Sequence, residues 1–189
     1  MKDSTEETTK ILAPKYKGIV GVCGASKISQ EVYEKVLKLG KAIAEEGYAI
    51  ACGGLYGTME AICKGAKSAS NGGFTIGIIP TKNKEIANDY VDLVIPTGIG
   101  EARNIILVST AEKIVTISGG SGTLSEIAFA WRQNKPICAF KATGGWSKKL
   151  AGKRIDNTRK DKVHSATSIS EIIKFLKQSE RYTTNEMNI

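Results

Sequence analysis

Short apolar runs alternate with longer amphipathic stretches along most of the chain. In the stretch 31–46, for example, Val32, Val36, Leu39 and Ile43 recur with helical spacing, which predicts a helix with one buried face. Further helices are expected at 58–70, 101–111, about 121–133 and 168–178. The apolar runs, which predict buried strands, lie at 18–23, 48–52, 74–79, 92–95, 113–117, 136–140 and 163–166.

Strands of this kind separated by helices are typical of a parallel sheet with helices on both faces. We therefore predict an α/β fold, a Rossmann-like doubly wound parallel sheet of about seven strands. One nucleotide-binding domain is expected over residues 16–180, between a flexible N-terminal arm (1–15) and a C-terminal tail (181–189). Both ends lack a periodic pattern.

The helix near 121–133 carries the clearest stripe after the first. Leu124, Ile127, Ala128 and Trp131 follow the i, i+3, i+4, i+7 spacing and are expected to pack on the sheet. Phe129 falls outside this stripe, so it is the candidate for an exposed contact.

Composition adds bounds on location and partners. The chain has 189 residues, 41% of them hydrophobic, and a formal net charge of +8. Its apolar runs are too short to cross a bilayer and the N-terminus lacks a signal-peptide core, so a cytoplasmic protein is expected.

The excess charge is concentrated between Lys141 and Lys162, where eight Lys or Arg face two Asp. Such a segment could bind a polyanion or be a solvated, mobile loop. We favour the loop, and a nucleic-acid partner is not expected, because only Trp146 is interleaved with the basic residues.

The cysteines and the single histidine do not indicate a metal site. Cys23, Cys52, Cys63 and Cys138 form no CxxC pair and no zinc spacing, so they are expected to be buried thiols. His164 lies just after the basic segment and is interpreted as a surface residue.

Four predicted strands are followed by loops of small residues. The carboxyl ends of parallel strands share one edge of the sheet, which is where ligands bind in such folds. Free N–H groups at helix starts favour anions, so the four loops together predict a phosphate-bearing, nucleotide-sized ligand. None of them is a Walker A loop or a GxGxxG motif. The candidate binding residues are Gly24, Ala25 and Ser26, then Gly53, Gly54, Gly57 and Thr58, then Gly98, and finally Gly119, Gly120, Ser121, Gly122 and Thr123.

Two charged residues beside these loops are candidates for chemistry. Arg103 stands at a helix start, where the dipole disfavours a cation, and Glu126 follows the fourth loop. A residue placed against local preference suggests a functional site. The alternatives are a surface ion pair of Arg103 with Glu101 or Glu112, and an ordinary helix-start acid for Glu126.

The loops resemble known motifs. "SGGSGTLSE", which begins at Ser118, resembles the PGGxGTxxE signature of the LONELY GUY family, and "CGGLYGTME" resembles its GGGxxGLMG loop. Arg103 stands fifteen positions before Ser118, as the family's arginine does before its motif proline. The pair Arg103-Asn104 is closer to the related molybdenum cofactor carrier proteins. Departures from the LONELY GUY pattern are Ser118 for the proline, Cys52 and Glu60 for glycines, and Glu101-Ala102 for His-Glu.

The resemblance implies a phosphoribohydrolase that cleaves the N-glycosidic bond of a nucleoside 5′-monophosphate such as AMP. Glu126 then faces the ribose, the N–H groups of Gly120, Gly122 and Thr123 hold the phosphate, and Arg103 secures the base or leaving group. No cofactor is required and no metal is expected, and a homodimer or larger homo-oligomer is implied. A non-catalytic carrier of the molybdenum cofactor, a pterin, is the alternative. A single-strand nucleic-acid binder is a third hypothesis, and a lysine decarboxylase is not expected.

Overall fold

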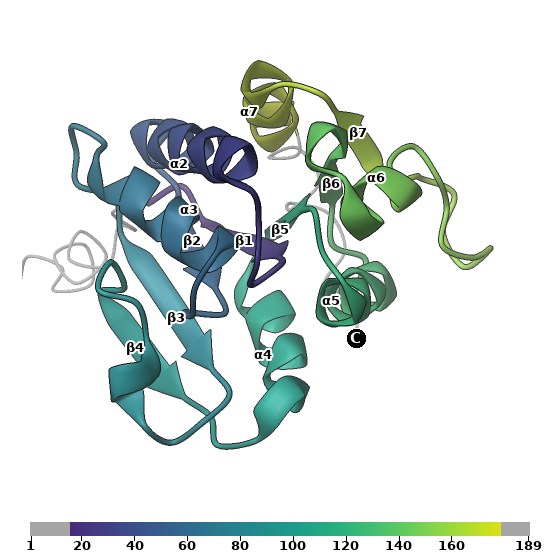
Figure 1. Cartoon of the computed structure of the whole chain (residues 1–189). Coiled ribbons are helices and arrows are strands. Elements are labelled where there is room, and N and C mark those ends of the chain that lie inside the picture. Colours follow the sequence, from purple (N-terminus) through teal and green to yellow (C-terminus); the bar gives the residue numbers. More distant parts are fainter. Residues whose placement is uncertain (1–15, 179–189) are drawn as a thin grey trace, which may run out of the picture.

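The computed structural model describes residues 16–178, which form one seven-stranded parallel sheet with helices on both faces (Figure 1). This confirms the predicted fold class. The expected arm and tail lie outside the described residues. The strands are β1 Ile19–Gly24, β2 Ala49–Cys52, β3 Thr75–Ile79, β4 Leu93–Pro96, β5 Lys113–Ile117, β6 Ile137–Phe140 and β7 His164–Ala166. The helices are α2 Gln30–Glu45, α3 Thr58–Lys67, α4 Arg103–Thr110, α5 Ser121–Arg132, α6 Gly145–Leu150 and α7 Ile169–Gln178, with short 3-10 turns η1 Lys84–Ile86, η2 Gly100–Ala102 and η3 Lys141–Thr143.

The strand order β4-β3-β2-β1-β5-β6-β7 places β1 near the middle of the sheet. From β1 the chain moves outward through β2, β3 and β4. It then crosses back to β5 on the other side of β1 and continues to β7. The order therefore reverses between β1 and β5, and the last residues of these strands, Gly24 and Ile117, lie side by side. Such a switch point opens a crevice at the carboxyl ends of the strands.

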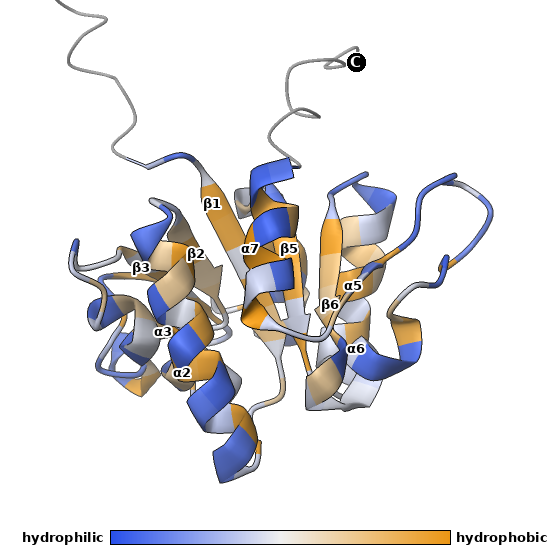
Figure 2. Ribbon diagram, turned by 90° about the horizontal axis from the view of Figure 1, so that it is seen from above, coloured by the Kyte–Doolittle hydropathy of each residue, from blue (hydrophilic) through white to orange (hydrophobic). Residues whose placement is uncertain are grey.

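Two hydrophobic clusters cover the two faces of the sheet. Helices α2, α3 and α7 pack on one face, where Leu39 and Ile62 are fully buried. Helices α4 and α5 cover the other face, where Leu107 and Trp131 are buried. Strands β1 and β6, which both have neighbours on either side in the sheet, are correspondingly hydrophobic (Figure 2). The core is therefore split by the sheet, and the site residues on α4 and α5 belong to the second layer.

Helices α2 and α3 cross at two glycines. Gly40 of α2 lies against the backbone of Ile62, and Gly65 of α3 lies against the backbone carbonyl of Leu37. A side chain at either position would overlap these atoms. The helix backbones can approach this closely only because both positions lack a Cβ.

The buried face of α5 differs from the predicted stripe. Ile127 and Trp131 are buried, but Ala128 is exposed and Leu124 is only half-buried. The prediction missed the polar part of the inward face because it counted apolar residues alone. Phe129 is half-buried against the second cluster, so its expected exposure is also wrong. The residues that α5 buries are Thr123, Glu126, Ile127, Ala130 and Trp131.

The basic segment is more ordered than a mobile loop in its first part. Residues 141–143 form η3 and α6 follows directly, with Ser147 fully buried. Trp146 and Leu150 of α6 pack against the second hydrophobic cluster. The loop interpretation is therefore wrong for residues 141–150.

The remaining expectations about single residues fit the structure. All four cysteines are buried thiols. His164 is exposed and stacks on Phe175, with ring centroids 5.0 Å apart. Within residues 16–178 the helices are too short or too polar to span a membrane.

Candidate functional site

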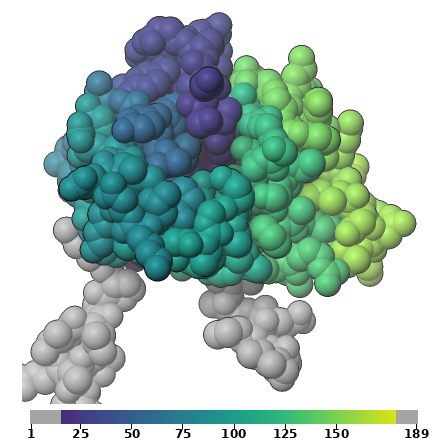
Figure 3. All heavy atoms as spheres, turned by 60° about the horizontal axis from the view of Figure 1, so that its bottom comes forward, coloured from purple at the N-terminus to yellow at the C-terminus, as the bar shows by residue number. Residues whose placement is uncertain are grey.

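A cavity of about 670 Å³ opens at the carboxyl ends of β1 and β5. In the space-filling view a hollow lies where the purple, teal and green parts of the chain meet (Figure 3). The strand reversal between β1 and β5 explains its position, because the loops after these strands diverge to opposite faces of the sheet. Its walls come from Val22, from Gly24, Ala25, Ser26 and Lys27, from Gly53, Leu55 and Met59, from Glu101, Arg103 and Asn104, and from Gly120, Ser121, Gly122, Thr123, Ser125 and Glu126.

The N-terminus of α5 forms one wall of this cavity. Its N-cap residue, Gly120, has no side chain to bond the first N–H groups. Within residues 16–178 no backbone or side-chain atom accepts a hydrogen bond from the N–H groups of Ser121, Gly122 or Thr123. Unpaired donors at the positive end of a helix attract anions. This wall therefore suits a phosphate group.

Arg103 and Glu126 form a buried pair that also lines the cavity, with Glu126 one turn along α5 from Gly122. Arg103 Nη1 lies 3.5 Å from Glu126 Oε1, and the two residues are only 6% and 5% exposed. Arg103 therefore pairs with Glu126 and not with Glu101 or Glu112, the alternative partners considered from the sequence. A carboxylate near the anion-binding wall is thus balanced by its own cation.

The guanidinium of Arg103 lacks most of its hydrogen bonds. Its contact with Glu126 is long, and Nε has no partner among the described atoms. Both Nη atoms pack against Gly53, where an added Cβ would lie 2.6 Å from each of them. Buried guanidinium groups normally satisfy their five donors. Arg103 can gain its missing bonds from a ligand that brings acceptor atoms into the cavity.

Burial raises the pKa of the Glu126 carboxyl to about 7, against the attraction of Arg103. The nearby Cys23 thiol, whose own pKa is raised by burial, acts to lower the pKa of this carboxyl. The negative charge of Glu101 acts to raise the pKa of Glu126. Glu126 can therefore change its charge near neutral pH, which is a property of groups that take part in chemistry.

The raised pKa of Glu126 predicts that the free energy of unfolding depends on pH. Between pH 4.5 and 7 the unfolded chain ionises Glu126 while the folded chain keeps it protonated, so stability falls as the pH rises. Glu126→Gln removes this titration, and we expect it to stabilise the protein by up to about 3 kcal/mol more at pH 8 than at pH 4.5. Chemical denaturation at several pH values measures the difference.

Glu34→Gln on the exposed face of α2 is the matched control and should change stability little at any of these pH values. An effect of Glu126→Gln that stays constant from pH 4.5 to 8 would contradict the prediction.

Asn104 links α4 to α5 beside this pair. Its Nδ2 donates to Ser125 Oγ at 2.9 Å, and Ser125 Oγ donates to the carbonyl of Gly122 at 2.7 Å. Asn104 Nδ2 also lies 3.5 Å from Glu101 Oε2, while Oδ1 has no partner within the described residues. The network fixes the starts of α4 and α5 relative to each other, and with them Arg103 and Glu126.

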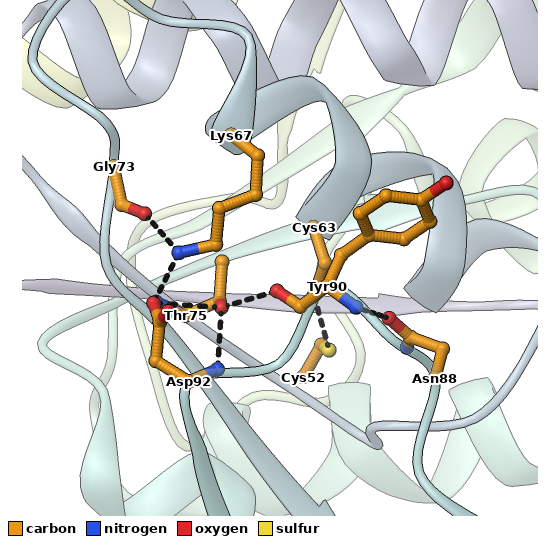
Figure 4. A network of polar contacts seen from close by, with 8 residues as sticks. All are labelled: Cys52, Cys63, Lys67, Gly73, Thr75, Asn88, Tyr90 and Asp92. Atoms are coloured by element: carbon orange, nitrogen blue, oxygen red, sulfur yellow. Dashed lines mark hydrogen bonds and ion pairs between the residues drawn. The ribbon is translucent and has the colours of Figure 1, made fainter.

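The second glycine loop is held from the side of β3 and β4. Asn88 Nδ2 donates to the carbonyls of Gly54 (3.1 Å) and Leu55 (2.7 Å). Its Oδ1 accepts from Tyr90 N–H, and the Tyr90 carbonyl accepts from Thr75 Oγ1 at 2.6 Å (Figure 4). This chain of bonds keeps Gly53 in place as the surface against which Arg103 packs.

The same network continues to the far end of α3. Asp92 accepts from Thr75 and pairs with Lys67, whose Nζ also donates to the Gly73 carbonyl at 2.7 Å. Cys52 Sγ lies 3.5 Å from Cys63 Sγ (Figure 4). Cys52 Sγ also accepts a hydrogen bond from Gly54 N–H at 3.4 Å. Strand β3, helix α3 and the second loop are thereby joined into one rigid unit.

Comparison with known proteins decides the family. The model of the SLOG cluster4 family matches residues 17–173. The chain belongs to this family. Solved relatives include the molybdenum cofactor binding protein of Rippkaea orientalis (34% identical, TM-score 0.74, 87% of this chain and 98% of that one). The molybdenum cofactor carrier protein of Chlamydomonas reinhardtii is similar too (30%, TM-score 0.71, 87% and 99%).

Curated relatives include a cytokinin riboside 5′-monophosphate phosphoribohydrolase of Mycobacterium tuberculosis, which is 32% identical over 112 residues. This match spans 58% of the chain and 59% of that enzyme. The predicted relation to the LONELY GUY and molybdenum cofactor carrier proteins is thereby confirmed at the level of the superfamily.

In this SLOG cluster4 protein the cavity brings together only part of the candidate set from the sequence. Gly54 packs against Gly77 and Ile79, Gly57 against Ser26, and Thr58 is buried beneath Gly24. These residues shape the loops from behind and do not line the cavity. Gly98 lies against the Lys82 side chain, because β4 is at the edge of the sheet, far from the reversal between β1 and β5. Gly119 also lies behind the lining, against Thr123.

Seven lining residues lie outside the predicted set of site residues: Val22, Lys27, Leu55, Met59, Glu101, Asn104 and Ser125. Lys27 follows the first loop directly, and extending that loop to the N-cap Ser29 would have included it. Ser125 precedes Glu126, but its role depends on Asn104, which no local pattern reveals. Leu55 and Met59 give the cavity its apolar surface, and nothing in the sequence distinguishes them from core residues.

Proposed function

We propose that this protein binds a phosphorylated nucleotide-type ligand in the cavity and hydrolyses the N-glycosidic bond of a nucleoside 5′-monophosphate such as AMP. One observation carries the proposal. A buried arginine with unsatisfied donors is paired with a carboxylate of raised pKa, and both line the cavity that the unpaired N–H groups of α5 enter. A ligand with an anionic end and a polar, acceptor-bearing part matches the free N–H groups of α5 and the unpaired donor of Arg103.

The phosphate is assigned to the α5 N-terminus, with Lys27 as a further cation on the same cavity wall as Ser26. Backbone N–H groups and the helix dipole favour the charge of the phosphate even though the loop before α5 contains no lysine. The sugar and base then extend toward Arg103 and Glu126. A volume of about 670 Å³ lies in the range of ordinary small-molecule sites.

Hydrolysis of AMP gives adenine and ribose 5-phosphate, with water entering at the sugar carbon that loses the base. Positive charge develops on the sugar as the glycosidic bond breaks, and an ionised carboxylate beside it stabilises that charge. Glu126 is the residue proposed for this role. Arg103 keeps Glu126 ionisable in a buried place and donates to the base or leaving group. The curated phosphoribohydrolases with similar sequences support this reading.

A second candidate is a non-catalytic carrier of the molybdenum cofactor, favoured by solved carrier proteins that align over nearly their whole length. The residues fit the organic part of that cofactor, since the free N–H groups of α5 can hold its phosphate. In this role Arg103 and Asn104 would bond the polar edge of the pterin, while the cofactor brings its own metal. The homo-oligomer expected from the resemblance stays a prediction.

The experiment separates binding from catalysis. We expect isothermal titration calorimetry to show binding of AMP, and chromatography after incubation to show free adenine and ribose 5-phosphate. AMP binding without adenine release would favour the carrier, which titration with a phosphorylated pterin then tests. Absence of binding by AMP, inorganic phosphate and the pterin would overturn the proposed function.

A further inference from the structure

The segment that follows β6 is hydrogen-bonded to Ser118, the first residue of the glycine signature. Thr143 Oγ1 accepts a hydrogen bond from Ser118 N–H at 2.7 Å, and Ser147 N–H donates to the Ser118 carbonyl at 3.0 Å. Trp146 N–H donates to the next carbonyl, that of Gly119, at 3.1 Å. Residues 143–147 are called the brace below. It satisfies both backbone groups of Ser118 at once.

Ser118 needs such support because its backbone is left-handed, with φ 53°. A residue with a Cβ adopts this conformation only at an energetic cost, and such residues persist where the surroundings fix them. Gly119 follows with φ 101°, so two successive residues turn the chain from β5 into α5. The direction of this turn sets where the first N–H groups of α5 point.

The brace is itself rigid. Thr143 is 7% exposed and its hydroxyl donates to the Phe140 carbonyl at 2.7 Å. Ser147 is fully buried and donates to Thr116 Oγ1 of β5 at 3.0 Å. Between them Gly145 lies so close to the Ser118 backbone that no side chain would fit. The brace can therefore hold Ser118 against its conformational preference.

We propose that Thr143, through the brace, is a positioning residue for the anion-binding wall. By holding Ser118 left-handed, it aims the N–H groups of Ser121, Gly122 and Thr123 at the phosphate of the ligand. The phosphate part of this inference rests on the proposed function. Residues 143–147 of the basic segment then support the turn through their backbone and hydroxyl groups. The neighbouring lysines have no part in this role.

Residue 118 is a serine in this chain, whereas the signature that this loop resembles begins with proline. Proline, which begins the signature that this loop resembles, has φ fixed near −65° and no N–H to donate to Thr143. It could not take the conformation of Ser118. The turn into α5 in this chain is therefore one that requires a brace.

The test compares Thr143→Val with Thr143→Ser. Valine keeps the shape but removes the acceptor for Ser118 N–H, and we expect the affinity for AMP and for inorganic phosphate to fall about tenfold. Serine keeps the hydroxyl and should bind like the wild type. Calorimetry measures both affinities. In the ligand-free protein, NMR follows the intraresidue HN–Hα NOE of Ser118, which is strong when the residue is left-handed because the two protons are then close together.

A rescue variant separates positioning from packing. Glycine adopts positive φ readily, so adding Ser118→Gly to Thr143→Val should restore the affinity to within a few-fold of the wild type. Loss that glycine fails to restore, or wild-type affinity in Thr143→Val, would overturn the proposal. If Thr143→Val does not fold, Ser118→Gly alone decides, since it should bind at least as tightly as the wild type and weaker binding would contradict the brace.

The two proposals fail in different ways. A wild-type protein that binds neither AMP nor phosphate overturns the proposed function and the phosphate part of this inference. A Ser118 cross-peak that is unchanged in ligand-free Thr143→Val overturns the brace itself, whatever the ligand.

Discussion

Glu126→Gln is expected to lower the rate constant of AMP hydrolysis by about 100-fold or more, while AMP binding changes only a few-fold. Glutamine keeps the volume and an acceptor for Arg103, but it carries no charge with which to stabilise a cationic sugar. Alanine is a poorer test, because it leaves the buried Arg103 without its partner and would itself destabilise the fold. Single-turnover measurement of adenine release gives the rate constant without contribution from product dissociation.

The pH profile provides an independent check on the same residue. The wild-type kcat/KM should rise with pH through about 7, as Glu126 ionises in the free protein. The residual activity of Glu126→Gln should lack this rise. Glu34→Gln, on the exposed face of α2, should behave as the wild type in rate and in profile. Equal rates in the Glu126 and Glu34 variants would remove Glu126 from the proposed chemistry.

Gly65→Ala is expected to destabilise the protein by about 3 kcal/mol. Helix propensity alone predicts the opposite sign, a gain of about 1 kcal/mol for alanine in a helix interior. The contact decides, because the new methyl group would overlap the Leu37 carbonyl of α2, and a backbone cannot rotate away as a side chain can. Chemical denaturation monitored by circular dichroism measures the change.

Lys38→Ala, at an exposed position of α2, is the control and should stay within about 0.5 kcal/mol of the wild type. A stabilised Gly65→Ala variant would show that the two helices separate at little cost. The close crossing would then be a consequence of the glycines and not a requirement of the fold.

Local patterns were sufficient for the strands and the longer helices, but they missed η3 and α6 in the basic segment. The predicted strand at 113–117 matches β5 residue for residue, and the first helix is displaced by one position only. The strand β5 is buried along its whole length and α2 is buried on one face, so the apolar pattern of each segment records its environment. For α5 the same criterion counted Ala128 as inward and omitted Glu126. Helical periodicity in apolar residues does not register a polar face that is buried because it lines a cavity.

For the candidate site, glycine loops after strands pointed to the edge of the sheet where the cavity opens, since the carboxyl ends of parallel strands meet there. They could not tell which loops reach the cavity, because that depends on strand order. The loop at Gly98 follows an edge strand and lies apart, whereas Lys27 lies in the lining. The brace was invisible for the same reason, since Thr143 and Ser118 are 25 positions apart.

By itself the sequence determined the strands, the longer helices and the edge of the sheet where the cavity opens, because the patterns that predict them involve residues only a few positions apart. Tertiary structure decided that Arg103 pairs with Glu126 at 3.5 Å, that burial raises the Glu126 pKa, and that the basic segment supports the turn at Ser118. Each of these depends on contacts between segments that are far apart in the sequence. The distance between two side chains and their burial are set by such contacts, and a pattern along the sequence does not contain them.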